Sequence, residues 1–164
     1  MLGVASLRSV FIDQLSILYS AKIHLTNNLP AFIKHSTFKT LKLALTEDLE
    51  DTKTQMVCIK TMFRMLNETS ITDNCLGMTA LVNEAFKQVD YNKATTFESD
   101  MSIIFYMGVI ENMQLGAGRM LNLIAQKPAY TPYAQLVTEC LDMASDNARL
   151  FHCVAEEYID ITTN

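Results

Sequence analysis

Apolar side chains recur along this chain every three or four residues, the spacing that places them on one face of an α-helix. The clearest example is the stripe formed by Ile103, Met107, Ile110 and Leu121. No segment fits the alternating pattern of a β-strand better than the helical one. The pattern predicts helices at about Leu7–His35, Phe38–Asn67, Cys75–Val89 and Ser99–Gln126, and a last helix that opens at Thr131–Pro132.

Residues with strong local preferences mark the ends of these helices. Pro30 lies inside the first helix and is expected to bend or divide it. Ser36–Thr37 is typical of a turn and helix cap, and Ser99 or Asp100 is expected to cap the fourth helix. Two polar segments are predicted loops: residues 68–74 and 90–98.

Long helices joined by short connections pack into a bundle. The sequence therefore predicts an all-α protein, a four-helix bundle with one additional short helix. The chain is long enough to bury one substantial core, so we expect a single domain over residues 1–164. No internal repeat or low-complexity segment interrupts it.

Composition narrows the classes of function that this bundle can serve. Hydrophobic residues make up 49% of the chain and charged residues 19%, which is typical of a globular protein. The net charge of -5 disfavours a face that binds nucleic acid. We expect neither a membrane span nor a secretory signal, because charged residues interrupt the apolar runs. Four cysteines without CxxC spacing indicate reduced thiols in a cytoplasmic protein.

Each long helix carries polar side chains near the middle of its apolar stripe. Lys22 lies between Leu18 and Leu25, and Glu111 precedes Gln114 by three residues on one helical face. Such groups need partners, because burying them alone is costly. The candidate site is a buried polar cluster with these members: Lys22, Glu50, Asp51, Gln55, Glu111, Gln114 and Asn147.

Three interpretations of this cluster are open. Inward carboxylates on facing helices can bind two metal ions, and Glu50 and Glu111 are the candidate ligands for iron or manganese. The number of carboxylates is low, however, and Lys22 places an ammonium where a dication would sit. The prediction is therefore a metal-free cluster in which Lys22 neutralises Glu111 and amides satisfy the remaining groups. In the third interpretation, some of these side chains extend to the surface.

Several short motifs follow one another along nearly the whole chain. They are Leu7–Leu15, Leu18–Ala21, Leu29–Pro30, Leu49–Thr52 with Gln55, Cys75 with Met78 and Leu81–Val82, and Val109–Glu111 with Gln114. In this order, the motifs resemble the YciF-like ferritin-like stress proteins. The resemblance implies a ferritin-like four-helix bundle with an added helix, usually dimeric and associated with stress.

The resemblance also implies where the metal ligands of that family fall in this chain. The glutamate of the first helix falls at Lys22, and the Glu-x-x-Glu motif falls at Glu111 and Gln114. The acidic run of the last helix falls at Asp142–Ala144. The chain is therefore identified as a divergent member with a degenerate di-metal site.

Two classes of function follow. The prediction is a non-catalytic, stress-associated bundle without a cofactor, acting as a homodimer or by binding another protein. The alternative is a di-iron or di-manganese protein with oxidase, peroxide-handling or metal-storage activity. Apolar surface beyond the needs of four helices favours the homodimer, and the short helix around Met78–Phe86 is its candidate interface.

Overall fold

The computed structural model describes residues 2–70, 76–91 and 96–163. Within these ranges the helices are α1 Leu2–His35, α2 Lys39–Leu66, α3 Leu76–Tyr91, α4 Thr96–Ala125, a short 3-10 helix η1 Pro128–Tyr130, and α5 Thr131–Thr163. No strand occurs among the described residues, so the all-α prediction is confirmed. None of these helices combines the length and the apolar character needed to cross a bilayer.

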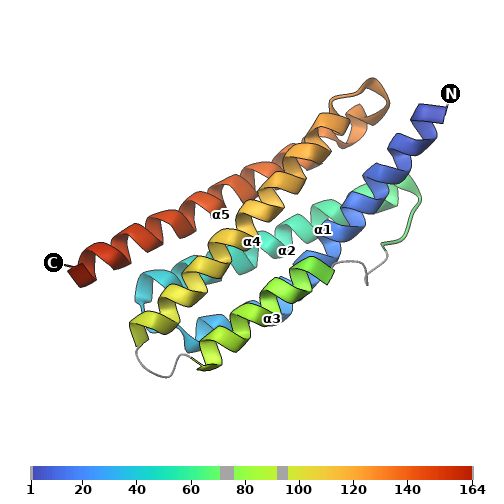
Figure 1. Cartoon of the computed structure of the whole chain (residues 1–164). Helices are drawn as coiled ribbons and strands as arrows, with labels where there is room; N and C mark the ends of the chain where they lie inside the picture. Colours follow the sequence, from blue (N-terminus) through green and yellow to red (C-terminus); the bar gives the residue numbers. More distant parts are fainter. Residues whose placement is uncertain (1, 71–75, 92–95, 164) are drawn as a thin grey trace.

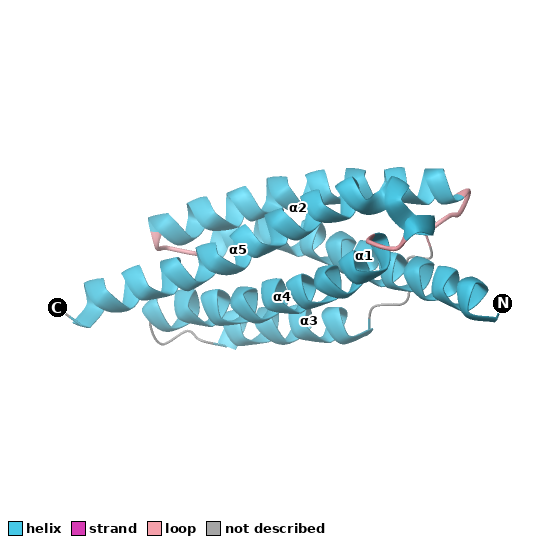
Figure 2. Ribbon diagram, turned by 90° about the horizontal axis from the view of Figure 1, so that it is seen from above, coloured by secondary structure: helices cyan, strands magenta, loops and turns pink. Residues whose placement is uncertain are grey.

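The four long helices lie side by side as a bundle, with α1 and α2 as one antiparallel pair and α4 and α5 as the other (Figure 1). Because α2 and α4 run in the same direction, the chain must return along the bundle between them. The short helix α3 makes this return, packed against α1 and α4. Figure 2 shows the same arrangement from above, with helices connected by short loops where the chain is described.

The apolar side chains form two hydrophobic clusters, one toward each end of the bundle. The first cluster includes Leu25, Leu45 and Phe151, near the turn between α1 and α2. The second includes Phe11 and Ile59, near the start of α1 and of α5. Between the two clusters each long helix contributes polar side chains, so the core is divided in the middle.

The start of α2 is capped by a side chain from α4. Asp100 lies inside α4 with none of its surface exposed, and its carboxylate accepts hydrogen bonds from the backbone N–H of Thr37, at 2.9 and 3.1 Å, and of Phe38, at 2.8 Å. The Thr37 hydroxyl donates to it at 2.6 Å, and the Tyr158 hydroxyl at 3.4 Å. We call these four residues the Asp100 clamp. The prediction that Ser36–Thr37 caps α2 is therefore wrong, and so is the prediction that Ser99 or Asp100 caps α4, because α4 begins at Thr96.

Several other local predictions differ from the structure. The helix α1 begins at Leu2 and continues through Pro30 without a break, and Pro30 is exposed, so its ring lies away from the core. Residues 90–91 and 96–98, predicted as loop, are helical, whereas residues 71–75 and 92–95 lie outside the described residues, as does the side chain of Met78.

The apolar face of α3 is used within the chain. Val82 and Ala85 are 1% and 0% exposed, and the Phe86 ring stacks on Phe32 of α1 with 4.6 Å between centroids. These side chains cannot also cover a second molecule. The homodimer through the segment around Met78–Phe86 stays a prediction, and Val82, Ala85 and Phe86 contribute little free apolar surface to it.

Candidate functional site

The middle of the bundle holds a layer of polar side chains between the two hydrophobic clusters. Each member is at most 3% exposed. The members are Lys22 from α1, Asp48, Thr52 and Gln55 from α2, Glu111 and Gln114 from α4, and Asn147 from α5. We call this group the polar layer. All four long helices contribute to it, and among the described residues it is the one level of the bundle where buried charges from different helices meet.

Lys22 is hydrogen-bonded to an amide and not directly to an acid. Its Nζ donates to Oε1 of Gln114, and Nε2 of Gln114 donates to Oε1 of Glu111 at 2.7 Å. Among the described side chains, none of the ion pairs within 4.0 Å involves Lys22 or Glu111. The predicted neutralisation of Glu111 by Lys22 is therefore indirect, because the Gln114 amide lies between the two charges.

Asp48 occupies the buried position on α2 that the sequence analysis gave to Glu50. Nδ2 of Asn147 donates to Oδ1 of Asp48 at 3.0 Å, and Asp48 has no exposed surface. The Glu50 side chain is 66% exposed and pairs with Nζ of Lys53 at 2.6 Å. The assignment of Glu50 to the buried cluster, and as a candidate ligand, is wrong, because two residues along a helix turn a side chain by roughly 200°.

Asp51 lies at the edge of the polar layer, half-buried. Burial raises the pKa of its carboxyl group, and a hydrogen bond with Asn147 opposes this shift. Asp48 and Thr52 were not among the predicted members of the cluster, although their spacing in the sequence indicates burial. Leu45, Asp48 and Thr52 continue one stripe at alternating spacings of three and four residues, which is the phase of the core-facing side of α2.

Some oxygen atoms of the layer have no hydrogen-bond partner. Among the described residues, the buried side-chain atoms in this condition are Oδ2 of Asp48, Oγ1 of Thr52 and Oε1 of Gln55. All three belong to α2, and Gln55 uses its Nε2 to donate to the backbone oxygen of Cys140 at 3.3 Å. Each buried polar atom without a partner costs about 1–3 kcal/mol. The layer therefore lowers the stability of the bundle relative to an apolar core of the same shape.

Burial shifts every ionisable group of the layer toward its neutral form. It raises the pKa of Glu111 from 4.5 to about 7. It raises the pKa of Asp48 well above the ordinary value, and the charge of Glu111 adds to this shift. Burial also lowers the pKa of Lys22, although the charges of Glu111 and Asp48 oppose it. One lysine thus faces two carboxyl groups, and the layer is electrically neutral when one of the two acids holds a proton.

A cavity of about 20 Å³ adjoins the layer on the side of the second hydrophobic cluster. Lys22, Gln114 and Cys140 line it together with apolar side chains. This volume is sufficient for one water molecule. A water there would give the Lys22 ammonium a second acceptor beside Gln114.

The donors of the polar layer differ from those of a ferritin-like di-metal centre. Such a centre draws a glutamate from each of two helices and a Glu-x-x-His pair from each of two others. Here Lys22 is a cation, Gln114 is an amide, and Asp48 and Glu111 are the buried carboxylates. Within the described part of the chain, no three His, Cys, Asp or Glu side chains gather closely enough to hold a metal ion. These residues do not fit a di-metal centre.

Comparison with known proteins places the chain beside other helical bundles. The model of a protein family, described as a domain of unknown function (DUF892), matches residues 6–163. The structure of the E. coli stress protein YciF matches with a TM-score of 0.87 and 23% identity, over 94% of this chain and 97% of that one. YcfI from Rhodopseudomonas palustris matches with a TM-score of 0.83 and 20% identity, over 89% and 92%.

A protein from Xanthomonas campestris is also similar, with a TM-score of 0.66 and 15% identity over 96% of this chain and 99% of that one. No curated protein matches the sequence. At these levels of identity the solved structures show the fold, a YciF-like helical bundle that spans nearly all of this chain. The predicted fold is therefore confirmed.

Proposed function

The chain belongs to the DUF892 family, and we propose that it is a metal-free, non-catalytic member that acts through its surface. The observation that carries this proposal is the burial of Lys22, which is 3% exposed and hydrogen-bonded inside the polar layer. Its place on the first helix is where the resemblance to YciF-like proteins implies a glutamate ligand. A dication there would meet a buried like charge, which is strongly unfavourable where the dielectric constant is low.

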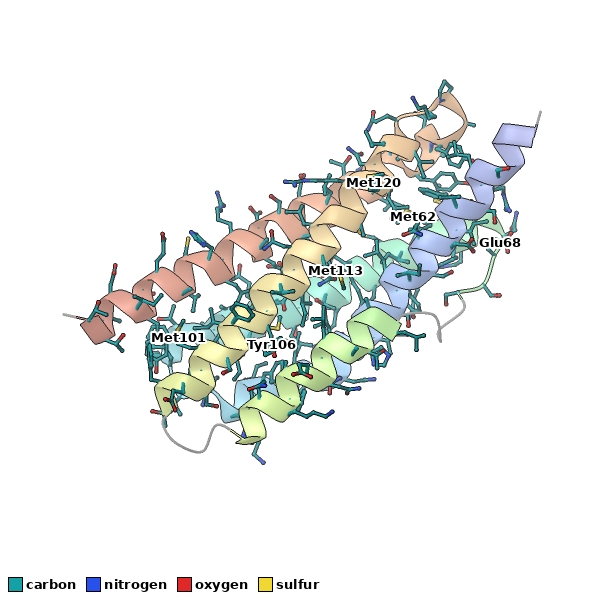
Figure 3. The ribbon with its side chains drawn as sticks, in the orientation of Figure 1. Met62, Glu68, Met101, Tyr106, Met113 and Met120 are labelled. Carbon is teal, nitrogen blue, oxygen red and sulfur yellow. The ribbon has the colours of Figure 1, made fainter. Side chains whose placement is uncertain are left out.

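A surface for self-association supports the second half of the proposal. Exposed apolar side chains follow one face of α4, and we call them the α4 stripe: Phe105, Val109, Met113, Met120 and Leu123, which are 68%, 40%, 41%, 63% and 62% exposed. Figure 3 shows Met113 and Met120 along this helix. Between residues 101 and 118 the one charged residue of α4 is Glu111, which is buried. An uncharged apolar stripe of this kind is typical of a protein interface.

Two glycines beside the α4 stripe also support an interface on this helix. A Cβ atom added at Gly108 or Gly116 would meet nothing within 4 Å. Glycine in the interior of a helix costs about 0.5–1 kcal/mol relative to alanine, and packing within this chain gives no compensation. A helix from a second copy could approach α4 closely at both positions. We infer a homodimer formed through the α4 stripe, in a stress-associated role like that named for E. coli YciF.

Elemental analysis of protein purified without chelators tests the metal-free half of the proposal. We expect far less than one iron or manganese ion per chain. Lys22→Glu returns a carboxylate to this position and is expected to raise metal binding, whereas Lys42→Glu makes the same charge change at an exposed site and is the control. About two metal ions per chain in the unmodified protein would overturn the proposal and favour oxidase, peroxide-handling or storage chemistry.

Light scattering tests the proposed dimer. We expect a particle of about twice 18.5 kDa at micromolar concentration. Met113→Glu places a charge in the α4 stripe and is expected to give monomers. Val57→Glu, at a position on α2 that is 60% exposed, is the matched control and should leave the dimer intact. A particle of 18.5 kDa for the unmodified chain would contradict the dimer.

A further inference from the structure

Two thiols meet where α2 packs against α5, next to the polar layer. Cys58 lies on α2 and is 8% exposed, and Cys140 lies on α5 and is partly buried. The two residues face each other across the helix pair, because Cys140 contacts Gln55, one turn before Cys58, and Cys58 contacts Glu139, which precedes Cys140. Both are free thiols in the structure. The packing of α2 against α5 therefore brings together two thiols from distant parts of the sequence.

Hydrogen bonds on both sides hold this contact in register. Nε2 of Gln55 donates to the backbone oxygen of Cys140 at 3.3 Å, and Sγ of Cys140 donates to the backbone oxygen of Gln55 at 3.9 Å. Sγ of Cys58 donates to Oε2 of Glu139 at 3.9 Å. Each cysteine thus contacts a near neighbour of the other, which places the two thiols side by side between α2 and α5.

We propose that Cys58 and Cys140 form a reversible disulfide that links α2 to α5 when the protein meets a small-molecule disulfide. One cysteine, as its thiolate, attacks a sulfur of the small molecule, so that a mixed disulfide forms and one small thiol leaves. The second cysteine then attacks the protein sulfur of this mixed disulfide and releases the other small thiol. The two cysteines lose two electrons and two protons, and the small disulfide gains them as two thiols.

The position of the pair determines what this bond would do. A bond between Cys58 and Cys140 closes a loop of about 80 residues, which includes α3 and α4. Closing a loop of this size removes much of the freedom of the unfolded chain and stabilises the folded one. For a chain of this length the thermal midpoint is expected to rise by roughly 10 °C.

The surroundings of Cys58 and Cys140 also determine the rate at which they form a disulfide. Burial raises the pKa of the Cys140 thiol to about 12, and burial raises that of Cys58 as well. Little thiolate is therefore present at neutral pH, and the reaction is expected to take hours. Cys153 is exposed on α5, so it should form a mixed disulfide sooner but has no described thiol partner.

Oxidised glutathione and peptide mapping test the proposal on the full chain. After incubation with oxidised glutathione, we expect a cross-linked peptide pair that contains Cys58 and Cys140, and its loss after treatment with a reducing thiol. The thermal midpoint should rise by roughly 10 °C in the unmodified chain and in Cys153→Ser. It should not rise in Cys58→Ser or in Cys140→Ser.

Two results would overturn the proposal. In one, Cys58 and Cys140 remain free, or carry glutathione singly, after Cys153 has been fully modified. In the other, the cross-linked peptides join Cys153 or Cys75 to one member of the pair. The mapping on the unmodified chain decides between these results and the expected one even if a serine variant does not fold.

Discussion

Two buried carboxylates in this bundle have opposite surroundings. Asp100 and Asp48 both have no exposed surface. Asp100 accepts hydrogen bonds from two backbone N–H groups and from the hydroxyls of Thr37 and Tyr158. Asp48 accepts one from Asn147 through Oδ1, and its Oδ2 has no partner. The Asp100 clamp thus satisfies its carboxylate with fixed donors, whereas the polar layer leaves its own incompletely bonded.

The two sites therefore differ in their effect on stability: the Asp100 clamp stabilises the fold, whereas the polar layer lowers its stability. The Asp100 clamp fixes the start of α2 against α4, because the carboxylate accepts hydrogen bonds from two backbone N–H groups and two hydroxyls. The polar layer contains charge from α1, α2 and α4 and unbonded atoms on α2, so an apolar core would be more stable there. This composition supports our proposal of a former ligand site in which Lys22 supplies the positive charge.

The largest expected effect is in the Asp100 clamp. Asp100→Ala removes the acceptor of the Thr37 and Phe38 N–H groups and leaves them buried without partners. We expect a loss of about 4–6 kcal/mol in the free energy of unfolding. Urea denaturation measures it, with Asp142→Ala at an exposed position of α5 as the control. A loss below about 1 kcal/mol would mean that water replaces the carboxylate and that the clamp is not structural.

Removing the positive charge of the polar layer should be the next most costly change. Lys22→Met keeps the length of the side chain but leaves Glu111 and Asp48 without a counter-charge. We expect a loss of about 3–5 kcal/mol in unfolding free energy at neutral pH. Lys42→Met, at an exposed position of α2, should change it by less than about 0.5 kcal/mol. Equal denaturant midpoints for Lys22→Met and the parent would show that the buried ammonium does not contribute to stability.

The polar layer should also make stability depend on pH. The pKa of Glu111 is raised from 4.5 to about 7 in the folded protein, so the folded state holds this proton more tightly than the unfolded state does. The contribution of Glu111 is therefore fully present below about pH 4.5 and is lost as pH rises through about 7. The change amounts to about 3 kcal/mol. Asp48, whose pKa is also raised, acts in the same direction.

Denaturation of the parent and of Glu111→Gln across this pH range isolates that contribution. The parent's advantage over Glu111→Gln should shrink by about 3 kcal/mol as pH rises from about 4.5 to above 7. A difference between the two proteins that does not change with pH would contradict the proposed titration of Glu111.

The smallest expected effect is that of replacing Asp48 with asparagine, and the same replacement at Asp100 should cost more. Asp48→Asn keeps the acceptor for Asn147 and replaces the unbonded Oδ2 with an amide nitrogen. We expect a change within about 1 kcal/mol, toward greater stability at neutral pH. The same change in Asp100→Asn turns a donor toward the backbone N–H groups and should cost about 2–3 kcal/mol. Equal losses in the two variants would remove the distinction drawn between the sites.

The sequence predicted the level of the polar layer but not its connections. Lys22, Glu111 and Asn147 are buried in the structure because apolar residues flank them at helical spacing, and that spacing is visible in one dimension. Glu50 was misplaced because only the helical phase, not proximity in sequence, decides which side chain faces inward. The bridge through Gln114 depends on side-chain rotamers on two helices, and periodicity does not specify rotamers.

The Asp100 clamp could not be predicted from the sequence for a different reason. Asp100 and Thr37 lie on separate helices, and their contact exists only after α3 has returned the chain to the end where α2 begins. A local rule for helix caps assigns each residue to its own helix, so it gave Asp100 to α4. The number and approximate bounds of the helices were predictable because they follow from local pattern and from proline and turn residues.

A double-mutant cycle tests most directly whether the charge of Lys22 stabilises the acids of the polar layer. The unfolding free energies of Lys22→Met, Glu111→Gln and the combined variant would be measured at neutral pH. The account predicts that the combined variant recovers much of the loss of Lys22→Met, with a coupling of about 2 kcal/mol or more, because both charges are then absent. Losses that add to within about 0.5 kcal/mol would show that Lys22 and Glu111 are independent, and would contradict the account.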